Sequence, residues 1–219
     1  MAYGRSIDPL SATSRPRIVQ ARARRTRDKI IDQAKQAFAI RGYEATNLTD
    51  HILAPAGVSV GSFYHQFANK REVLLEIFAT TISERYATVL ERLSDGSSTS
   101  FGEAYHAILE ALLDDVDRNP DVWRIQLREH ESPDPEIRRV ALVGLGGWSD
   151  VALGVMRPWY PDDHPNVHVA ANMVALLSTA LVREYTHFTT EEQGERRESL
   201  VGTCVAFAEA GLDRLLAGA

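Results

Sequence analysis

Apolar residues recur with a helical spacing along most of the chain. Between Thr26 and Gly42 they follow the i, i+4, i+7, i+8 pattern that places side chains on one face of an α-helix. Gly42 suits the left-handed backbone that ends many helices. No segment alternates between apolar and polar residues in the manner of a half-buried strand. The pattern predicts an all-α fold, and its first helical face comprises Ile30, Ile31, Ala34, Ala37 and Phe38.

Two short helices are expected next. Thr46 is placed to cap a second helix, which Pro55 and Gly57 end. Ser59 is a candidate N-cap for a third helix over residues 60–67.

The remaining helices are longer. Asn69, with Glu72 three residues later, predicts the start of a fourth helix that runs to about Ser94. The later helices are expected at residues 101–116, at 122–129, from the segment ESPDPE to Trp159, at 166–187 and at 192–216.

On a helical wheel, residues 60–67 separate into two faces. Phe63 and Phe67, at i and i+4, form the face expected to be buried. A helix this short is marginal in water, so these rings must pack against the neighbouring helices. Small and polar residues are then turned outward.

A short helix that follows a glycine turn and presents a polar, small-residue face is typical of a helix-turn-helix unit, which binds DNA. Small residues permit close approach to the major groove, and Tyr64 and His65 can form hydrogen bonds with phosphates or base edges. An amphipathic three-helix core without DNA binding has the same pattern. The candidate DNA-binding residues are Thr46, Ser59, Val60, Gly61, Ser62, Tyr64, His65, Gln66 and Lys70.

Charge is unevenly distributed along the chain. The net charge is −6, but residues 1–75 contain 12 Lys and Arg against 6 Asp and Glu, leaving 12 basic and 24 acidic residues for the remainder. This asymmetry is typical of a basic nucleic-acid-binding head on an acidic body. Residues 1–21 lack apolar periodicity and are expected to form a disordered basic arm. Its end and the residues just after it carry Arg15, Arg17, Arg22, Arg24, Arg25 and Arg27.

The overall composition, with 44% hydrophobic and 25% charged residues, is that of a soluble globular protein. Cys204 is the only cysteine, which excludes an intrachain disulfide and fits a reducing cytoplasm. No secretory signal is expected at the start, and the apolar run 167–182 falls short of the ~20 residues of a membrane span. We therefore expect a cytoplasmic protein without a membrane partner.

Residues 25–78 closely resemble the DNA-binding domain of the TetR (tetracycline-repressor-like) family. The resemblance implies a helix-turn-helix domain over residues 22–70 and a helical effector-binding and dimerisation domain over residues 71–219. It implies a regulator, expected to be a repressor, that a small and largely apolar effector releases from a palindromic double-stranded DNA operator. The matching residues are Phe38, Gly42, Tyr43, Thr46, Asp50, Ala56, Gly57, Val58, Ser59, Gly61, Ser62, Phe63, Tyr64, Phe67 and Lys70.

Two departures from the family pattern affect the DNA-binding segment. The stretch TNLTDHILAPAGVS is one residue longer than usual, with Pro55 in place of a small helix former, so the turn is expected to be reshaped. Position 60 carries Val60 where many relatives have Lys or Arg. A valine can touch a thymine methyl group but cannot pair with a phosphate or guanine.

The resemblance also implies a homodimer formed through the last two helices, and an effector pocket. Apolar faces exist on both helices, although each face could equally belong to the monomer core. One face comprises Ala170, Met173, Val174, Leu177 and Leu181, and the other Leu200, Cys204, Phe207, Leu212 and Leu215. The candidate pocket residues, each of which could instead be plain core, are Phe101, Tyr105, Trp123, Trp148, Met156 and Trp159.

Other classes of function find weaker support. His164 and His168 follow Asp162 and Asp163 in a proline-rich loop, but no second cluster is spaced to complete a metal site. No nucleophile motif or phosphate loop is present, so neither an enzyme nor a cofactor is expected. A helical protein-interaction module without DNA binding remains the alternative hypothesis.

Overall fold

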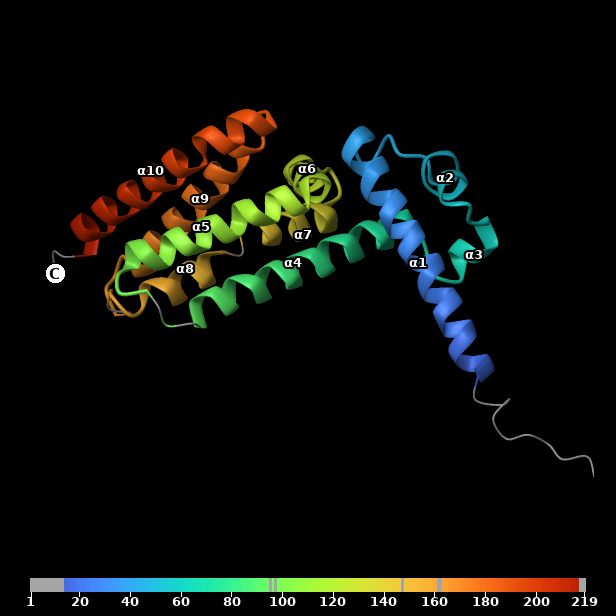
Figure 1. The fold of residues 1–219 in the computed structure, drawn as a ribbon, viewed down its shortest axis with the longest axis horizontal. Helices are drawn as coiled ribbons and strands as arrows, with labels where there is room; N and C mark the ends of the chain where they lie inside the picture. The colour runs from blue at the N-terminus through green and yellow to red at the C-terminus, as the bar shows by residue number, and fades with distance from the viewer. Residues whose placement is uncertain (1–13, 95, 97, 147, 161–162, 217–219) are drawn as a thin grey trace, which may run out of the picture. The chain divides into compact units, whose positions relative to one another are not determined.

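A computed structural model of the chain describes residues 14–94, 96, 98–146, 148–160 and 163–216. Within these ranges the regular secondary structure is entirely helical. The contacts divide the chain into two compact units, with the boundary between Leu74 and Leu75. The boundary falls four residues beyond the one expected at residue 70 and lies inside helix α4 (Lys70–Ser94; Figure 1).

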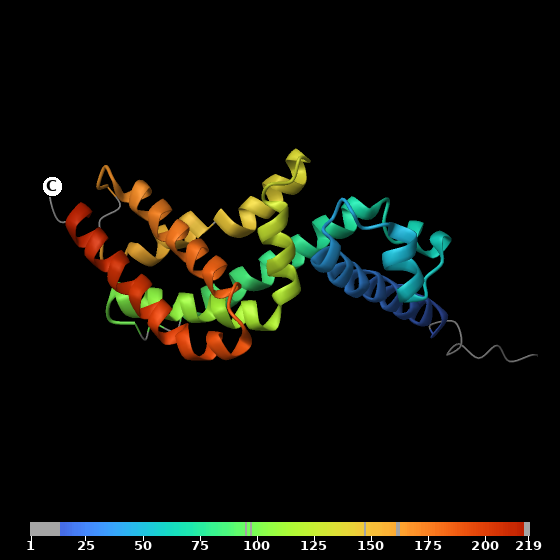
Figure 2. The same cartoon turned by 90° about the horizontal axis from the view of Figure 1, so that it is seen from above.

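The N-terminal unit is built on one long helix and three short ones. Figure 2 shows α1 running beside the short helices. Their buried apolar side chains form a common core that includes Ile30, Phe38, Ile52, Phe63 and Phe67. The elements are α1 (Ser14–Arg41), the π-helical turn η1 (Leu48–Leu53), α2 (Ala54–Ala56), α3 (Val60–Tyr64) and the first residues of α4 (Lys70–Ser94).

Helix α1 begins earlier than expected. It starts at Ser14, whereas the periodicity indicated Thr26, so residues 14–21 are helical and not part of an irregular arm. Pro16 does not prevent this, because it lies in the first turn, where a backbone N–H has no intrahelical partner. The expectation of disorder for residues 1–13 lies outside the described residues.

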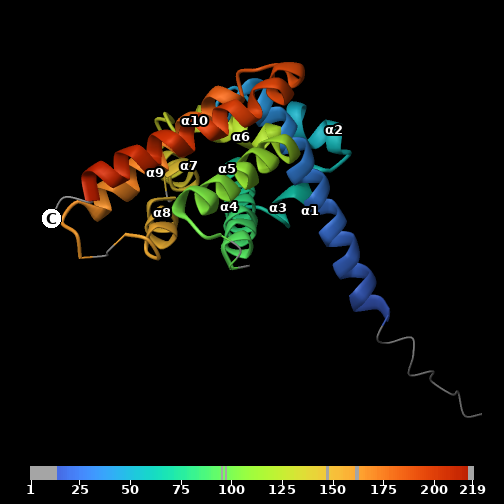
Figure 3. The same cartoon turned by 60° about the vertical axis from the view of Figure 1, so that its left-hand side comes forward.

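The C-terminal unit contains the rest of α4 and six further helices. Helices α9 and α10 lie side by side, and α10 also packs on α5 (Figures 1 and 3). A continuous apolar core joins α5, α8, α9 and α10. The further helices are α5 (Phe101–Arg118), α6 (Pro120–Glu129), α7 (Pro135–Gly146), α8 (Trp148–Met156), α9 (Val167–Tyr185) and α10 (Thr190–Leu216).

The segment from ESPDPE to Trp159, expected as a helix, is helical over α7 and α8, and Gly147 between them lies outside the described residues. By length and hydropathy alone, residues 135–156 would be long enough to cross a membrane. However, Trp148, Val155 and Met156 are buried in the apolar core, as in a core helix of a globular domain.

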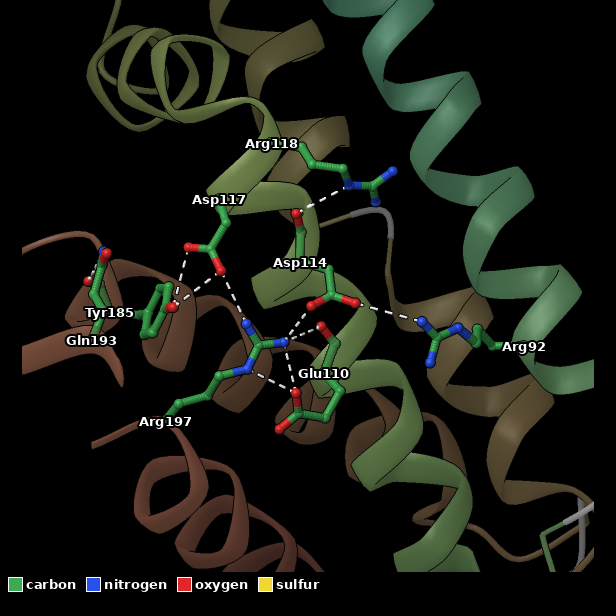
Figure 4. A network of polar contacts seen from close by, with 8 residues as sticks. All are labelled: Arg92, Glu110, Asp114, Asp117, Arg118, Tyr185, Gln193 and Arg197. Carbon is green, nitrogen blue, oxygen red and sulfur yellow. Dashed lines mark hydrogen bonds and ion pairs between the residues drawn. The ribbon is translucent and has the colours of Figure 1, made fainter. Parts of the chain in front are cut away.

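An arginine on α10 holds three carboxylates on α5 (Figure 4). The Arg197 guanidinium donates to Glu110 at 2.7 Å, to Asp117 at 2.9 Å and also to Asp114. Burial lowers the pKa of Arg197, but the hydrogen bonds to Glu110 and Asp114 outweigh this and raise it overall. Tyr185 donates from its hydroxyl to Asp117. The network fixes α10 against α5.

Candidate nucleic-acid interface and effector pocket

Two phenylalanines anchor α3 in the N-terminal unit. Phe63 and Phe67 are fully buried, and their ring centroids lie 5.8 Å apart. The Arg27 guanidinium of α1 lies 4.2 Å from the Phe67 ring centre and donates to the Gln66 carbonyl at 2.8 Å. The helical wheel predicted this buried face correctly, and α1 fixes the end of α3 in place.

The start of α3 is also where the sequence predicted it. Gly57 occupies the left-handed region at φ 63°, which favours glycine and turns the chain after α2. Ser59 caps α3, since its Oγ accepts a hydrogen bond from the Ser62 amide at 3.2 Å. The helix is shorter than expected, because it ends at Tyr64 and not at Phe67.

The outward face of α3 is exposed to solvent. Val60 is 48% exposed and Tyr64 is 59% exposed, while Gly61 and His65 are exposed as well. Ser62 is partly buried and its hydroxyl is bonded to that of Ser59. Gln66 is partly buried beside them.

Thr46 does not belong to this surface. Its side chain is 2% exposed, and its Oγ1 donates to the Gly42 carbonyl at 2.7 Å. The N-cap of η1 is instead Asn47, whose Oδ1 accepts from the Asp50 amide at 3.0 Å. The prediction that Thr46 caps this helix is therefore wrong, because its hydroxyl closes the turn that follows α1, and this bond leaves its buried side chain poorly placed for the predicted DNA contact.

Lys70 also has a structural role. Its ammonium group donates to the Tyr43 carbonyl at 2.6 Å and to the Thr46 carbonyl at 2.8 Å, and it lies 4.2 Å from the Tyr43 ring centre. These contacts tie the start of α4 to the loop after α1. They do not fit the free phosphate ligand that the sequence suggested.

The segment between Thr46 and Gly57 contains the π-helical turn η1. A π-helical turn holds more residues than an α-helical turn and appears often at functional sites. At the end of η1 the Ala54 amide donates to the Thr49 carbonyl, five residues back. Pro55 lies in the first turn of α2, where its missing N–H carries no penalty. The glycine turn at Gly57 is present, and the reshaping expected from the extra residue stays a prediction.

Basic side chains of α1 line a surface hollow of about 540 Å³ that also reaches the start of α3. The sequence has no Lys or Arg between Arg41 and Lys70, and the basic side chains that line this hollow all come from α1. The lining residues are Arg22, Arg25, Thr26, Lys29, Gly57, Val58, Ser59 and Ser62.

The candidate effector pocket is closed. A cavity of only about 10 Å³, roughly the space of one water molecule, lies between α5, α8 and α9. Of the six predicted residues, Tyr105 and Trp148 line it. Trp148 also stacks on Tyr86 at 4.9 Å between ring centres. The Tyr105 hydroxyl is bonded to Ser178 at 3.0 Å, and burial raises the pKa of Tyr105.

The other predicted pocket residues are core or structural. Phe101 and Met156 are buried, and Trp159 packs against the same core. Trp123 lies against a buried ion pair: its Nε1 donates to Asp115 at 2.9 Å, and the Arg85 guanidinium lies 3.7 Å from its ring centre.

The sequence analysis missed this ion pair. Arg85 Nε donates to Asp115 at 2.7 Å, with side-chain exposures of 1% and 8%. Arg85 Nη1 also donates to Gln126 on α6 at 3.2 Å. Burial lowers the pKa of Arg85, and Asp115 partly offsets this. A signal was present, since Arg85 falls on the apolar stripe of α4 between Ile82 and Val89.

The apolar faces of α9 and α10 are partly buried in the monomer core and partly exposed. Val174, Leu181 and Leu212 are buried in the monomer core. Other residues remain outside and border a hollow of about 440 Å³ between α9 and α10. The exposed members are Met173 (57%), Leu176 (58%), Phe207 (73%) and Leu215 (40%).

The proline-rich loop offers no metal centre in the part of the chain that the structure describes. His164 is buried and its Nδ1 accepts from the Asn166 amide at 3.2 Å. Among the described residues, no group of three or more His, Cys, Asp or Glu side chains is arranged to hold a metal ion. Asp162 lies outside the described residues.

Comparisons with known proteins agree with this architecture. Residues 30–77 match the family described as "Bacterial regulatory proteins, tetR family". The HTH-type transcriptional regulator TcmR of Streptomyces glaucescens is 28% identical over 150 residues, covering 59% of this chain and 65% of TcmR. The HTH-type transcriptional repressor KstR2 of Mycobacterium tuberculosis is 35% identical over 104 residues, covering 42% of this chain and 52% of KstR2. The chain thus spans between half and two thirds of these relatives.

A solved structure extends the likeness to both units. The transcriptional regulator FadR of Bacillus subtilis, solved in complex with stearoyl-CoA, aligns with a TM-score of 0.56. The alignment covers 87% of this chain and 98% of FadR at 18% sequence identity, which supports a common fold.

Proposed function

We propose that this chain, which belongs to the TetR family of bacterial regulatory proteins, is a cytoplasmic transcriptional repressor that binds operator DNA as a homodimer and is released by a small, largely apolar effector. The observation that carries the proposal is the division of α3 into two faces. Phe63 and Phe67 fix the helix in the core, and Val60, Tyr64 and His65 are left on the surface. A rigidly held helix with an exposed face can enter a major groove.

The charge of the N-terminal unit supports the same proposal. Arg22, Arg25 and Lys29 are exposed beside the start of α3, where they can neutralise phosphates. Each phosphate contact contributes about −0.9 to the slope of log K against log salt concentration. Phosphate contacts would position the unit on the duplex, and α3 would supply the base contacts.

In vitro selection from a random duplex library tests DNA binding. The proposal expects enrichment of an inverted repeat, with half-sites about one helical turn apart. Arg22→Ala and Arg25→Ala should each flatten the salt slope by about one, whereas Arg124→Ala, in the C-terminal unit, should not. Absence of any enriched sequence would refute the proposed function.

The exposed groove between α9 and α10 supports a homodimer. Apolar surface that is contiguous and rimmed by polar residues marks interaction sites, and Met173, Leu176 and Phe207 are each more than half exposed. Light scattering should give the mass of a dimer. Phe207→Glu should give a monomer, while Leu142→Glu, at an exposed site on α7, should not. A monomeric wild-type protein would contradict this arrangement.

The small cavity supports an apolar effector site. Its lining is apolar apart from the hydroxyls of Tyr105 and Ser178, so a ligand there would be largely apolar with a hydrogen-bonding group. The related FadR structure contains stearoyl-CoA, whose acyl chain is of this chemistry. Because only about 10 Å³ is open, binding requires Trp148 and α8 to move away from α5.

Helix α4 provides a covalent route between the two units. Within the N-terminal unit, Lys70 ties it to the Tyr43 and Thr46 carbonyls. Within the C-terminal unit, Arg85 ties it to Asp115, and Tyr86 stacks on Trp148 beside the cavity. A ligand that displaces Trp148 would therefore act on α4. Coupling of this kind is typically 1–3 kcal/mol and is reciprocal between effector and DNA.

A further inference from the structure

Neither the backbone conformation at Gly61 nor the described atoms around it require a glycine. Gly61 lies inside α3 and is not among the glycines with positive φ. A Cβ built at Gly61 would meet no atom within 4 Å in the described part of the chain. Glycine inside a helix is less favourable than alanine by about 1 kcal/mol. A methyl group at position 61 would therefore point into open space beside α3.

Val60 lies directly before this glycine, and its side chain is not buried in the core. Its side chain is 48% exposed in the first turn of α3. Its neighbour on the same surface, Tyr64, is 59% exposed and packs edge-on against Phe63. Val60 and Gly61 thus form a small apolar surface whose position Phe63 fixes.

The surrounding segment lacks the side chains that most often identify guanine. Arginine or lysine paired with guanine O6 and N7 is the commonest specific base contact in the major groove. No Lys or Arg occurs between Arg41 and Lys70, and the ammonium of Lys70 is bonded to two carbonyls. Apolar side chains, by contrast, contact the C5-methyl group of thymine.

We propose that Val60 is a specificity-determining residue that contacts the C5-methyl group of a thymine in each half-site, and that Gly61 lets α3 approach the base edges closely enough for this contact. The inference rests on the proposed function, because it requires α3 to enter the major groove. It adds the chemistry that is recognised there: a methyl group on an A·T pair.

Replacing thymine by deoxyuridine removes only this methyl group and preserves base pairing. Each thymine of the selected duplex is replaced in turn, and affinity is measured by fluorescence anisotropy. For the wild-type protein, one symmetric replacement per half-site should weaken binding by about fourfold for each methyl group that is removed. Val60→Ala should bind the thymine duplex more weakly and show no further weakening with deoxyuridine. Val143→Ala, which truncates a similarly exposed valine on α7, should keep the full deoxyuridine effect.

A second variant tests the approach at Gly61. Gly61→Ala should leave the melting temperature unchanged or raise it, because the added methyl group meets no atom of the described chain. It should weaken binding to the selected duplex. Unchanged binding by Gly61→Ala would overturn the close approach.

The deoxyuridine scan separates this inference from the proposed function. If a sequence is selected and bound but no replacement weakens binding, the proposed methyl contact is wrong. The proposed function as a DNA-binding regulator then still stands. The same holds if Val60→Ala retains the full deoxyuridine effect. If no sequence is selected at all, both the proposed function and the inference fail.

Discussion

The Nε atom of Arg85 lies 2.7 Å from the Oδ2 atom of Asp115, and both side chains are buried. The same carboxylate accepts the Trp123 indole N–H, and the guanidinium lies over the face of that ring. A buried charge is tolerated only when its partner and hydrogen bonds are present. This pair therefore makes the position of α4 against α5 depend on a specific contact.

Removing one member of the pair should be costly. Asp115→Ala leaves a buried guanidinium without its carboxylate and should lower the free energy of unfolding by about 3–5 kcal/mol. The double variant Arg85→Met/Asp115→Leu should recover much of that loss, because it removes both charges. Urea denaturation measures each value.

An exposed ion pair on the same two helices provides the control. Arg92 and Asp114 lie 3.4 Å apart with side-chain exposures of 47% and 43%. Arg92→Ala should change stability by less than about 1 kcal/mol. Equal losses for Arg92→Ala and Asp115→Ala would contradict the role given to burial.

The two faces of α3 predict opposite effects on stability. Phe63→Ala removes a fully buried ring and should cost about 3–5 kcal/mol. Tyr64→Ala, at a 59% exposed position, should leave the melting temperature nearly unchanged. Thermal unfolding followed by circular dichroism measures both. Unfolding of the N-terminal unit by Tyr64→Ala would show that the exposed face is needed for folding.

Two tryptophans distinguish the proposed pocket from the core around it. A compound that raises the melting temperature and weakens operator binding in one titration should lose both effects in Trp148→Ala, because Trp148 lines the cavity. Trp159→Ala should respond as the wild type does. If Trp148→Ala also responded normally, the effector would have to bind elsewhere, most simply in the groove between α9 and α10.

Tyr160 predicts a loss of stability in alkali. Burial and a hydrogen bond to Asp213 raise the pKa of Tyr160 from 10.0 to about 12. The folded state therefore favours the neutral phenol, so its contribution is complete below about pH 10 and is lost as the pH rises towards about 12. Tyr160→Phe cannot ionise, and its urea midpoint should fall less steeply across this window. If the urea midpoints of the two proteins fell equally steeply with pH, Tyr160 would make no contribution to the loss of stability.

Local patterns in the sequence were sufficient to predict where α3 begins and which of its faces is buried. The i, i+4 spacing of Phe63 and Phe67 fixes which face is buried, and Ser59 reaches an amide only three residues away. Such signals depend on residues within one or two helical turns. The same helical spacing places Tyr64 and His65 on the opposite, exposed face.

Contacts between distant residues could not be predicted in this way. Lys70 reaches carbonyls 24 and 27 residues earlier, so its structural role depends on the folded unit. The length of the second helix indicated an extra residue, but length alone does not predict the π-helical turn η1. Trp123 and Trp148 look alike in sequence, and only packing separates the partner of Arg85 from the cavity wall.

The central claim is that the exposed face of α3 reads DNA sequence. The most direct test compares affinities for the selected duplex and for a scrambled duplex of equal composition, in the wild type and in Tyr64→Ala/His65→Ala. The account predicts that the wild type binds the selected duplex at least about a thousandfold more tightly. The double variant should lose most of this preference while keeping its affinity for the scrambled duplex. A wild-type protein that binds both duplexes equally, or a variant with undiminished preference, would contradict the account.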